Sequence, residues 1–191
     1  MGNFLNIFFD AAVGNNIVLI AFLGLCPFIG MSSDVNKSIG MGAAVTFVTM
    51  LATIVTYPLY KYVLMPFNID FLETLTFILV IASLVQLVEF FLKKSAPALY
   101  SSMGVYLALI TSNCAILFVT LNVIKRGYSF IESLVYALGA ATGFVIALLL
   151  LAGIREKIDH TPVPKFLKGT PIMFIVSGLM SLGFYGIGKI F

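Results

Sequence analysis

Six long apolar runs, separated by charged or turn-forming residues, constrain the fold of this 191-residue chain more than any other feature. A helix needs about 20 apolar residues to cross the hydrocarbon core of a bilayer, and each run is long enough or nearly so. The runs cover residues 5–31, 39–60, 71–92, 99–123, 130–154 and 171–187. The sequence therefore predicts an all-α membrane protein with six transmembrane helices.

The composition excludes several classes of protein. Hydrophobic residues make up 61% of the chain and charged residues 10%, whereas a soluble domain carries about 25% charged residues. A water-soluble enzyme of this length cannot bury so much apolar surface. We therefore exclude a soluble enzyme, a disordered chain and a nucleic-acid-binding protein. We expect a single polytopic domain over residues 1–191, surrounded by the lipid bilayer.

Basic residues are distributed unevenly between the two ends of the predicted spans. Six spans place both termini on one side of the membrane. The loops opposite the termini hold seven of the 11 basic residues, namely Lys37, Lys93, Lys94, Arg155, Lys157, Lys165 and Lys168. Because positively charged loops stay in the cytoplasm, we expect both termini on the outer side of the membrane.

The two halves of the chain resemble each other. Residues 42–48 and 139–145 share a Gly-Ala-Ala start and a Phe-Val end at an offset of 97 residues. Small residues of this kind let membrane helices pack closely, so two packing motifs that agree by chance are one explanation. The other is a duplicated unit of three spans, with repeats over about residues 1–95 and 96–191. The second copy is then inverted, and inverted repeats place their functional site near the midplane.

The chain has two cysteines, one in the first predicted helix of each repeat. Cys26 stands between Gly24 and Pro27, and a proline inside a helix removes a hydrogen bond and clashes with the preceding turn. Cys114 directly follows Asn113, whose amide can either cap a broken helix or donate an N–H to the cysteine. The sequence therefore predicts broken first helices, with the break beside each cysteine.

Several chemical roles stay open for the cysteines. A free cysteine can be a small buried hydrophobe, and a disulfide is a second alternative. Thiolates are also soft ligands that suit iron–sulfur clusters. A [2Fe–2S] cluster usually takes four cysteines, so a cluster here requires another chain to donate two more. Asn15 and Asn16 add polar amides at membrane depth, which protein or water must satisfy.

The residues around both cysteines resemble one family of membrane proteins. The matching stretches are residues 15–19, 22–28, 76–81, 109–111 with 113–115, 154–156 and 178–182. Over essentially its whole length the chain is similar to the family that contains RnfA (also called RsxA) of Rnf ion-translocating oxidoreductase complexes. The same family contains, at a greater distance, the E component of sodium-pumping NADH:quinone oxidoreductases.

The resemblance implies a specific role. RnfA proteins have six spans with inverted symmetry and pair with the paralogue RnfE, and each of the two gives two cysteines to a [2Fe–2S] cluster inside the membrane. Cys26 and Cys114 occupy the ligand positions, beside Gly24, Pro27 and Asn113. The complex passes electrons between ferredoxin and NAD and couples this to Na⁺ or H⁺ translocation. It includes RnfB, RnfC, RnfD and RnfG in a bacterial or archaeal inner membrane. No flavin is expected on this chain.

Two other functions stay open. Residues 127–133 and 152–157 resemble the component of the quinone enzyme closely, so the equivalent subunit of a sodium-pumping NADH:quinone oxidoreductase is one alternative. The other is a secondary transporter or ion-channel subunit with a midplane site at the broken helices and purely structural cysteines. Iron in the purified complex favours the electron-transfer functions, and an iron-free complex favours the transporter.

Overall fold

The structure, a computed structural model, describes the chain except for residues 1, 68–71, 96–109, 111–112, 163–168 and 189–191. All regular elements in the described part are helices, which confirms the predicted all-α class. Three of these helices are long and apolar enough to cross a membrane, and three shorter apolar helices accompany them. These features agree with a multi-pass membrane protein, whereas the inverted arrangement of six spans stays a prediction.

The first predicted span is interrupted. α1 (Gly2–Phe9) passes into a π-helical turn, η1 (Asp10–Gly14), and the chain then runs without regular helix until α2 (Leu25–Met31). Pro27 lies inside the first turn of α2, where a helix needs no N–H from it. Gly24, directly before α2, adopts a left-handed φ of 77°. The interruption therefore lies before the proline and ends in a left-handed turn at Gly24.

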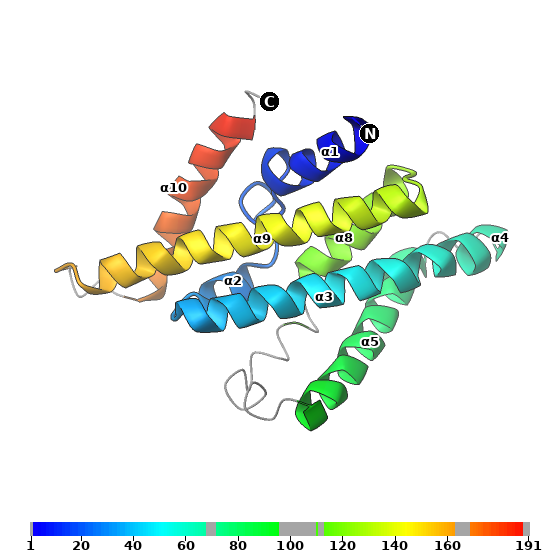
Figure 1. The fold of residues 1–191 in the computed structure, drawn as a ribbon, viewed down its shortest axis with the longest axis horizontal. Coiled ribbons are helices and arrows are strands. Elements are labelled where there is room, and N and C mark those ends of the chain that lie inside the picture. The colour runs from blue at the N-terminus through cyan, green and yellow to red at the C-terminus, as the bar shows by residue number, and fades with distance from the viewer. Residues whose placement is uncertain (1, 68–71, 96–109, 111–112, 163–168, 189–191) are drawn as a thin grey trace.

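Two long helices form the centre of the molecule. α3 (Val35–Leu59) and α9 (Phe130–Asp159) lie side by side and antiparallel along the long axis (Figure 1). α3 continues through η2 (Tyr60–Leu64) into α4 (Met65–Phe67), so this helical segment is longer than the predicted span. Pro58 lies inside α3, shortly before the π-helical turn. Prolines and π-bulges are both common where a long helix is kinked.

α9 is longer than its apolar run. It begins with a capping box, in which the Glu132 carboxylate accepts a hydrogen bond from the Ser129 backbone N–H at 2.9 Å. It ends at Asp159, so Arg155 and Lys157 belong to the helix. The sequence assigned both to the following loop, and that boundary is wrong. Basic residues are favourable in the last turns of a helix, where they face the negative end of its dipole.

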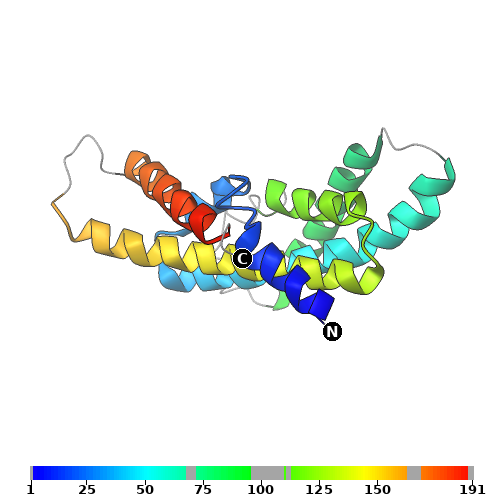
Figure 2. The same ribbon diagram turned by 90° about the horizontal axis from the view of Figure 1, so that it is seen from above.

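Three further helices surround the central pair. α8 (Cys114–Lys125) packs on α3 and α9, and α5 (Glu73–Ser95) contacts α3 and α8. α10 (Thr170–Gly188) contacts η1 and α9. α5 and α10 lie toward opposite ends of the α3–α9 pair (Figures 1 and 2). Much of the predicted span before Cys114 lies outside the described residues.

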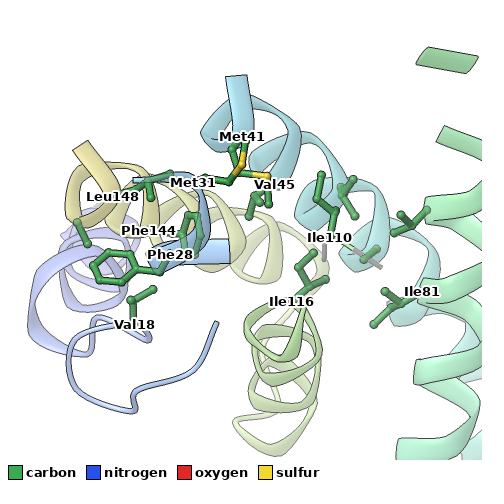
Figure 3. Packing of buried hydrophobic residues seen from close by; sticks show 14 of the residues in the cluster. Val18, Phe28, Met31, Met41, Val45, Ile81, Ile110, Ile116, Phe144 and Leu148 are labelled. Atoms are coloured by element: carbon green, nitrogen blue, oxygen red, sulfur yellow. The ribbon is translucent and has the colours of Figure 1, made fainter. Parts of the chain in front are cut away.

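A core of buried apolar side chains joins the half-helix α2 to the long helices. Phe28 and Met31 of α2 are fully buried (0% exposed) in this core. Figure 3 labels ten of its members: Val18, Phe28, Met31, Met41, Val45, Ile81, Ile110, Ile116, Phe144 and Leu148. Because lipid is as apolar as these side chains, close packing rather than exclusion from water holds such a core together. α2 is thus anchored by its packing although it has only 7 residues.

The small residues of the repeated motif are packing positions. A Cβ on Gly42 would lie 2.9 Å from the Val145 Cγ2, and one on Gly139 would lie 2.7 Å from a carbonyl oxygen of α1. The two glycines thus face different neighbours. Phe47 is exposed, whereas Phe144, which matches it in the motif, is buried. Close packing accounts for both motifs, and the duplication stays a prediction.

Candidate functional site

The two cysteines stand at the beginnings of two helices that meet in space. Cys114 is the first residue of α8 and Cys26 is the second residue of α2, and both side chains are exposed. The backbone N–H of Gly24 donates a hydrogen bond to the Sγ of Cys114 at 3.0 Å. The segment that carries one cysteine therefore binds the sulfur of the other.

Gly24 makes this approach possible because it has no side chain. A Cβ at this position would lie 3.1 Å from the Ala115 Cβ and 3.1 Å from the Asn113 Oδ1. Its φ of 77° also lies in the left-handed region that glycine adopts readily. Gly24, which the sequence singled out only as a helix breaker, is thus the contact between the two cysteine segments.

Asn113 caps α8. Its Oδ1 accepts a hydrogen bond from the Ala115 backbone N–H at 3.0 Å, which satisfies one of the donors that a helix start leaves without a partner. Of the two roles that the sequence left open, the cap is the one observed. The Nδ2 of Asn113 is buried and has no hydrogen-bond partner among the described residues.

Asn16 closes the interrupted segment and fastens it to α9. The side chain is buried, with 1% of its surface exposed. Its Oδ1 accepts from the backbone N–H groups of Val18 (3.1 Å) and Leu19 (3.4 Å). Its Nδ2 donates to the carbonyl oxygens of Ala12 and Gly143, each at 3.0 Å. Protein groups therefore satisfy this amide at membrane depth, and its role is structural.

Asn15 belongs to a different cluster of polar side chains. Its Nδ2 donates to the Asp10 carboxylate at 2.8 Å, and that carboxylate pairs with Arg126 at 3.4 Å. Arg126, in the turn between α8 and α9, also donates to the Tyr128 hydroxyl at 3.0 Å. This hydrogen bond raises the pKa of the Arg126 guanidinium above its ordinary value, and an arginine is charged at physiological pH in any case. The cluster ties η1 to the turn before α9.

Arg155 holds the far end of the helix that carries Cys26. Its guanidinium donates to the Ile29 carbonyl oxygen and to the Ser32 hydroxyl, each at 3.1 Å. α2 is therefore held at its start by the Gly24 contact and at its end by Arg155. The apolar pattern does not reveal this role, because Arg155 follows the last apolar residues and is expected in a loop. The signal for a partner is the position of this arginine, directly at the end of a long apolar run.

The donor chemistry of the site fits half of an iron–sulfur centre. Within the described ranges, no group of three or more His, Cys, Asp or Glu side chains is placed to hold a metal ion. Two soft thiols, both exposed, lie on segments in direct contact. A [2Fe–2S] cluster usually takes four thiolates, so two exposed thiols match half of such a ligand set.

The apolar helices and the two cysteine segments in contact define an α-helical, multi-pass membrane protein with a cysteine at each of two helix starts. The chain belongs to the Rnf-Nqr family, whose model, described as "Rnf-Nqr subunit, membrane protein", matches residues 4–191. The family resemblance found in the sequence is thereby confirmed.

Individual relatives cover nearly the whole chain. It is 51% identical to the A component of the ion-translocating oxidoreductase complex of Syntrophotalea carbinolica, over 97% of this chain and 96% of the relative. It is 50% identical to the A component of the Na(+)-translocating ferredoxin:NAD(+) oxidoreductase complex of Acetobacterium woodii, over 94% of each chain. It is 46% identical to the A component of the proton-translocating ferredoxin:NAD(+) oxidoreductase complex of Clostridium ljungdahlii, over 97% of this chain and 96% of the relative.

Proposed function

We propose that this chain is a membrane subunit of an ion-translocating ferredoxin:NAD⁺ oxidoreductase, in which Cys26 and Cys114 hold half of an intramembrane [2Fe–2S] cluster. The assignment to this kind of complex is supported by the names of relatives that are about 50% identical to the chain over nearly its full length. The observation that carries the assignment of the cysteines is the hydrogen bond from the Gly24 N–H to the Cys114 Sγ, which joins two segments with exposed thiols.

The residues of this chain would bind and orient the cluster. The thiolates of Cys26 and Cys114 are the ligands, and Asn16 and Arg155 hold the backbone that presents Cys26. When bound, the cluster supplies a one-electron carrier in the hydrocarbon interior, where no other redox centre is available. Burial among the surrounding helices and hydrogen bonds to sulfur are the protein's means of adjusting its potential.

The rest of the site comes from a partner in this proposal. A paralogous chain of the RnfE type donates two further cysteines, and RnfB, RnfC, RnfD and RnfG complete the complex in the inner membrane. The coupled ion is Na⁺ or H⁺, since relatives of similar identity are named for each. Both termini lie on the outer side.

Iron analysis of the purified pair tests the proposal. Co-expression with the RnfE-type paralogue should yield a coloured pair with one [2Fe–2S] cluster and its electron paramagnetic resonance (EPR) signal after reduction. Cys26→Ser and Cys114→Ser should each abolish the signal while the pair still co-purifies, because a hydroxyl is a poor ligand for iron. Cys26→Ala and Cys114→Ala control for packing and should behave in the same way.

Two outcomes contradict the proposal. A colourless, iron-free unaltered pair favours the transporter or channel alternative, in which the cysteines only pack. A full complement of iron in both serine variants rules out these residues as ligands. The equivalent component of a sodium-pumping quinone reductase is distinguished by the acceptor, since the whole complex would then reduce quinone and not NAD⁺.

A further inference from the structure

We propose that the backbone N–H of Gly24 is a positioning donor that raises the reduction potential of the cluster and sets the spacing of Cys26 relative to Cys114. This inference rests on the proposed function and deepens it. It assigns Gly24 a role beyond that of a helix breaker. The role follows from one hydrogen bond, one left-handed turn and the close approach of the Gly24 backbone to the side chains of Asn113 and Ala115.

The hydrogen bond is short and reaches the ligand atom itself. The Gly24 nitrogen lies 3.0 Å from the Cys114 Sγ, and the contact is partly buried. Reduction adds negative charge to an iron–sulfur cluster and its thiolates. A donor to sulfur therefore stabilises the reduced state more than the oxidised state and raises the potential. A low local dielectric strengthens this effect.

The surroundings of Gly24 leave no room for a side chain. The nearest atoms to an added Cβ are the Ala115 Cβ at 3.1 Å, the Asn113 Oδ1 at 3.1 Å and the Phe144 Cε2 at 3.5 Å. The first is fixed to the backbone of α8, and the second is engaged in capping that helix. A Cβ at Gly24 therefore requires a shift of a few tenths of an ångström between this segment and α8, and its left-handed φ adds strain; we expect this shift to lengthen the N–H···S contact.

The same displacement changes the position of the second ligand. Cys26 follows Gly24 by two residues, in the first turn of α2. The far end of α2 is held through the Ile29 carbonyl by Arg155. A shift at Gly24 therefore tilts α2 about that end and moves Cys26 relative to Cys114. The spacing of the two thiolates thus depends on the absence of a side chain at Gly24.

A pair of matched glycine substitutions tests the role. Gly127 adopts φ 63°, similar to the 77° of Gly24, but no described atom lies within 4 Å of its added Cβ. Gly127→Ala therefore carries a similar backbone strain without a steric contact. In the purified pair, an EPR-monitored redox titration should place the midpoint potential of Gly24→Ala below that of the unaltered protein. Gly127→Ala should leave the potential unchanged. An intact cluster with unchanged potential in Gly24→Ala overturns the inference.

A second measurement stays informative where Gly24→Ala fails to assemble. This chain is synthesised with glycine that carries the heavy nitrogen isotope and is combined with unlabelled partner before cluster reconstitution. Pulsed EPR of the reduced cluster should then detect a coupling to a labelled glycine nitrogen, and its absence overturns the inference. A cluster without that coupling leaves the proposed function intact, whereas an unaltered pair without any cluster overturns the proposed function and this inference together.

Discussion

Asn16 and Gly143 are joined by a hydrogen bond of 3.0 Å from the side-chain amide of the first to the carbonyl oxygen of the second, across a sequence separation of 127 residues. The bond is possible because the backbones approach closely. A Cβ on Gly143 would lie 2.6 Å from the Ala12 carbonyl oxygen. The interrupted segment before Cys26 is therefore fastened to α9.

Asn16→Ala should lower the free energy of unfolding by about 3 kcal/mol, because each buried backbone group left without a partner costs about 1–3 kcal/mol. Asn15→Ala is the matched control. Asn15 takes part in a hydrogen bond at an exposed site, and surface substitutions usually change stability by less than about 0.5 kcal/mol. Unfolding in mixed detergent micelles, followed by circular dichroism, measures both. Equal effects of the two substitutions would contradict the role assigned to Asn16.

Gly143→Ala should lower the stability of the protein, whereas Gly153→Ala should leave it unchanged or raise it. An added Cβ would lie 2.6 Å from the backbone carbonyl oxygen of Ala12, so the cost of overpacking falls near the upper end of about 1–3 kcal/mol. This cost exceeds the gain of about 1 kcal/mol from replacing a helical glycine. Gly153 lies in the same helix, and no described atom lies within 4 Å of its added Cβ. Gly153→Ala therefore gains the higher helix propensity of alanine without a steric cost. Thermal denaturation midpoints should fall for the first variant and hold or rise for the second, and a rise for Gly143→Ala would refute the close approach.

Arg155→Met should loosen the end of α2. The substitution removes two hydrogen bonds from a charged donor, and each such bond contributes about 1.5–3 kcal/mol. Amide hydrogen exchange in residues 28–32 should then become faster. Lys157→Met removes a charge from an exposed position of the same helix and should leave this exchange unchanged. Identical exchange in both variants would show that Arg155 does not hold α2.

The two thiols should be reactive in the chain by itself. Both cysteines are exposed, so iodoacetamide should label both when the chain is purified alone in detergent. In the pair with the RnfE-type paralogue both should become protected, since a partner and a cluster would cover them. A denatured sample gives the value for complete labelling. Stoichiometric iron in the singly expressed chain would show that the partner is not required.

The segment after α9 should face the cytoplasm. It includes Lys165 and Lys168, and positively charged segments stay on the cytoplasmic side. A reporter that is active only in the cytoplasm should work when fused after Lys168 and should be silent when fused after Phe191. The reversed pattern would place the termini in the cytoplasm and overturn the predicted orientation.

Local signals in the sequence located much of the site. Gly24 and Asn113 are the residues directly before α2 and α8, because a left-handed turn favours glycine and a helix start favours a capping amide. The proline signal was less informative. Pro27 lies within the first turn of α2, a position that a helix tolerates, so a proline alone does not locate a break to the residue.

The helix boundaries show the limit of counting apolar residues. The sequence ended the fifth span before Arg155, but α9 continues to Asp159. Hydropathy reports which residues prefer lipid and not where backbone hydrogen bonding stops. A helix can continue beyond its apolar run through residues such as arginine and lysine, because their long side chains carry the charged group to water or to a partner. For Arg155 that partner is the end of α2, far away along the chain.

The sequence by itself determined the helical class, the membrane environment and the position of the two cysteines beside residues that start a helix. Each follows from short-range physics: the thickness of a bilayer, the conformational freedom of glycine and the capping preference of asparagine. Only the tertiary structure decided that Gly24 contacts Cys114, that Asn16 binds Gly143 and that Arg155 caps α2. The residues of these pairs are 90, 127 and 126 positions apart in the chain. Hydrogen bonds across such separations depend on how helices pack, which no local pattern of residues encodes.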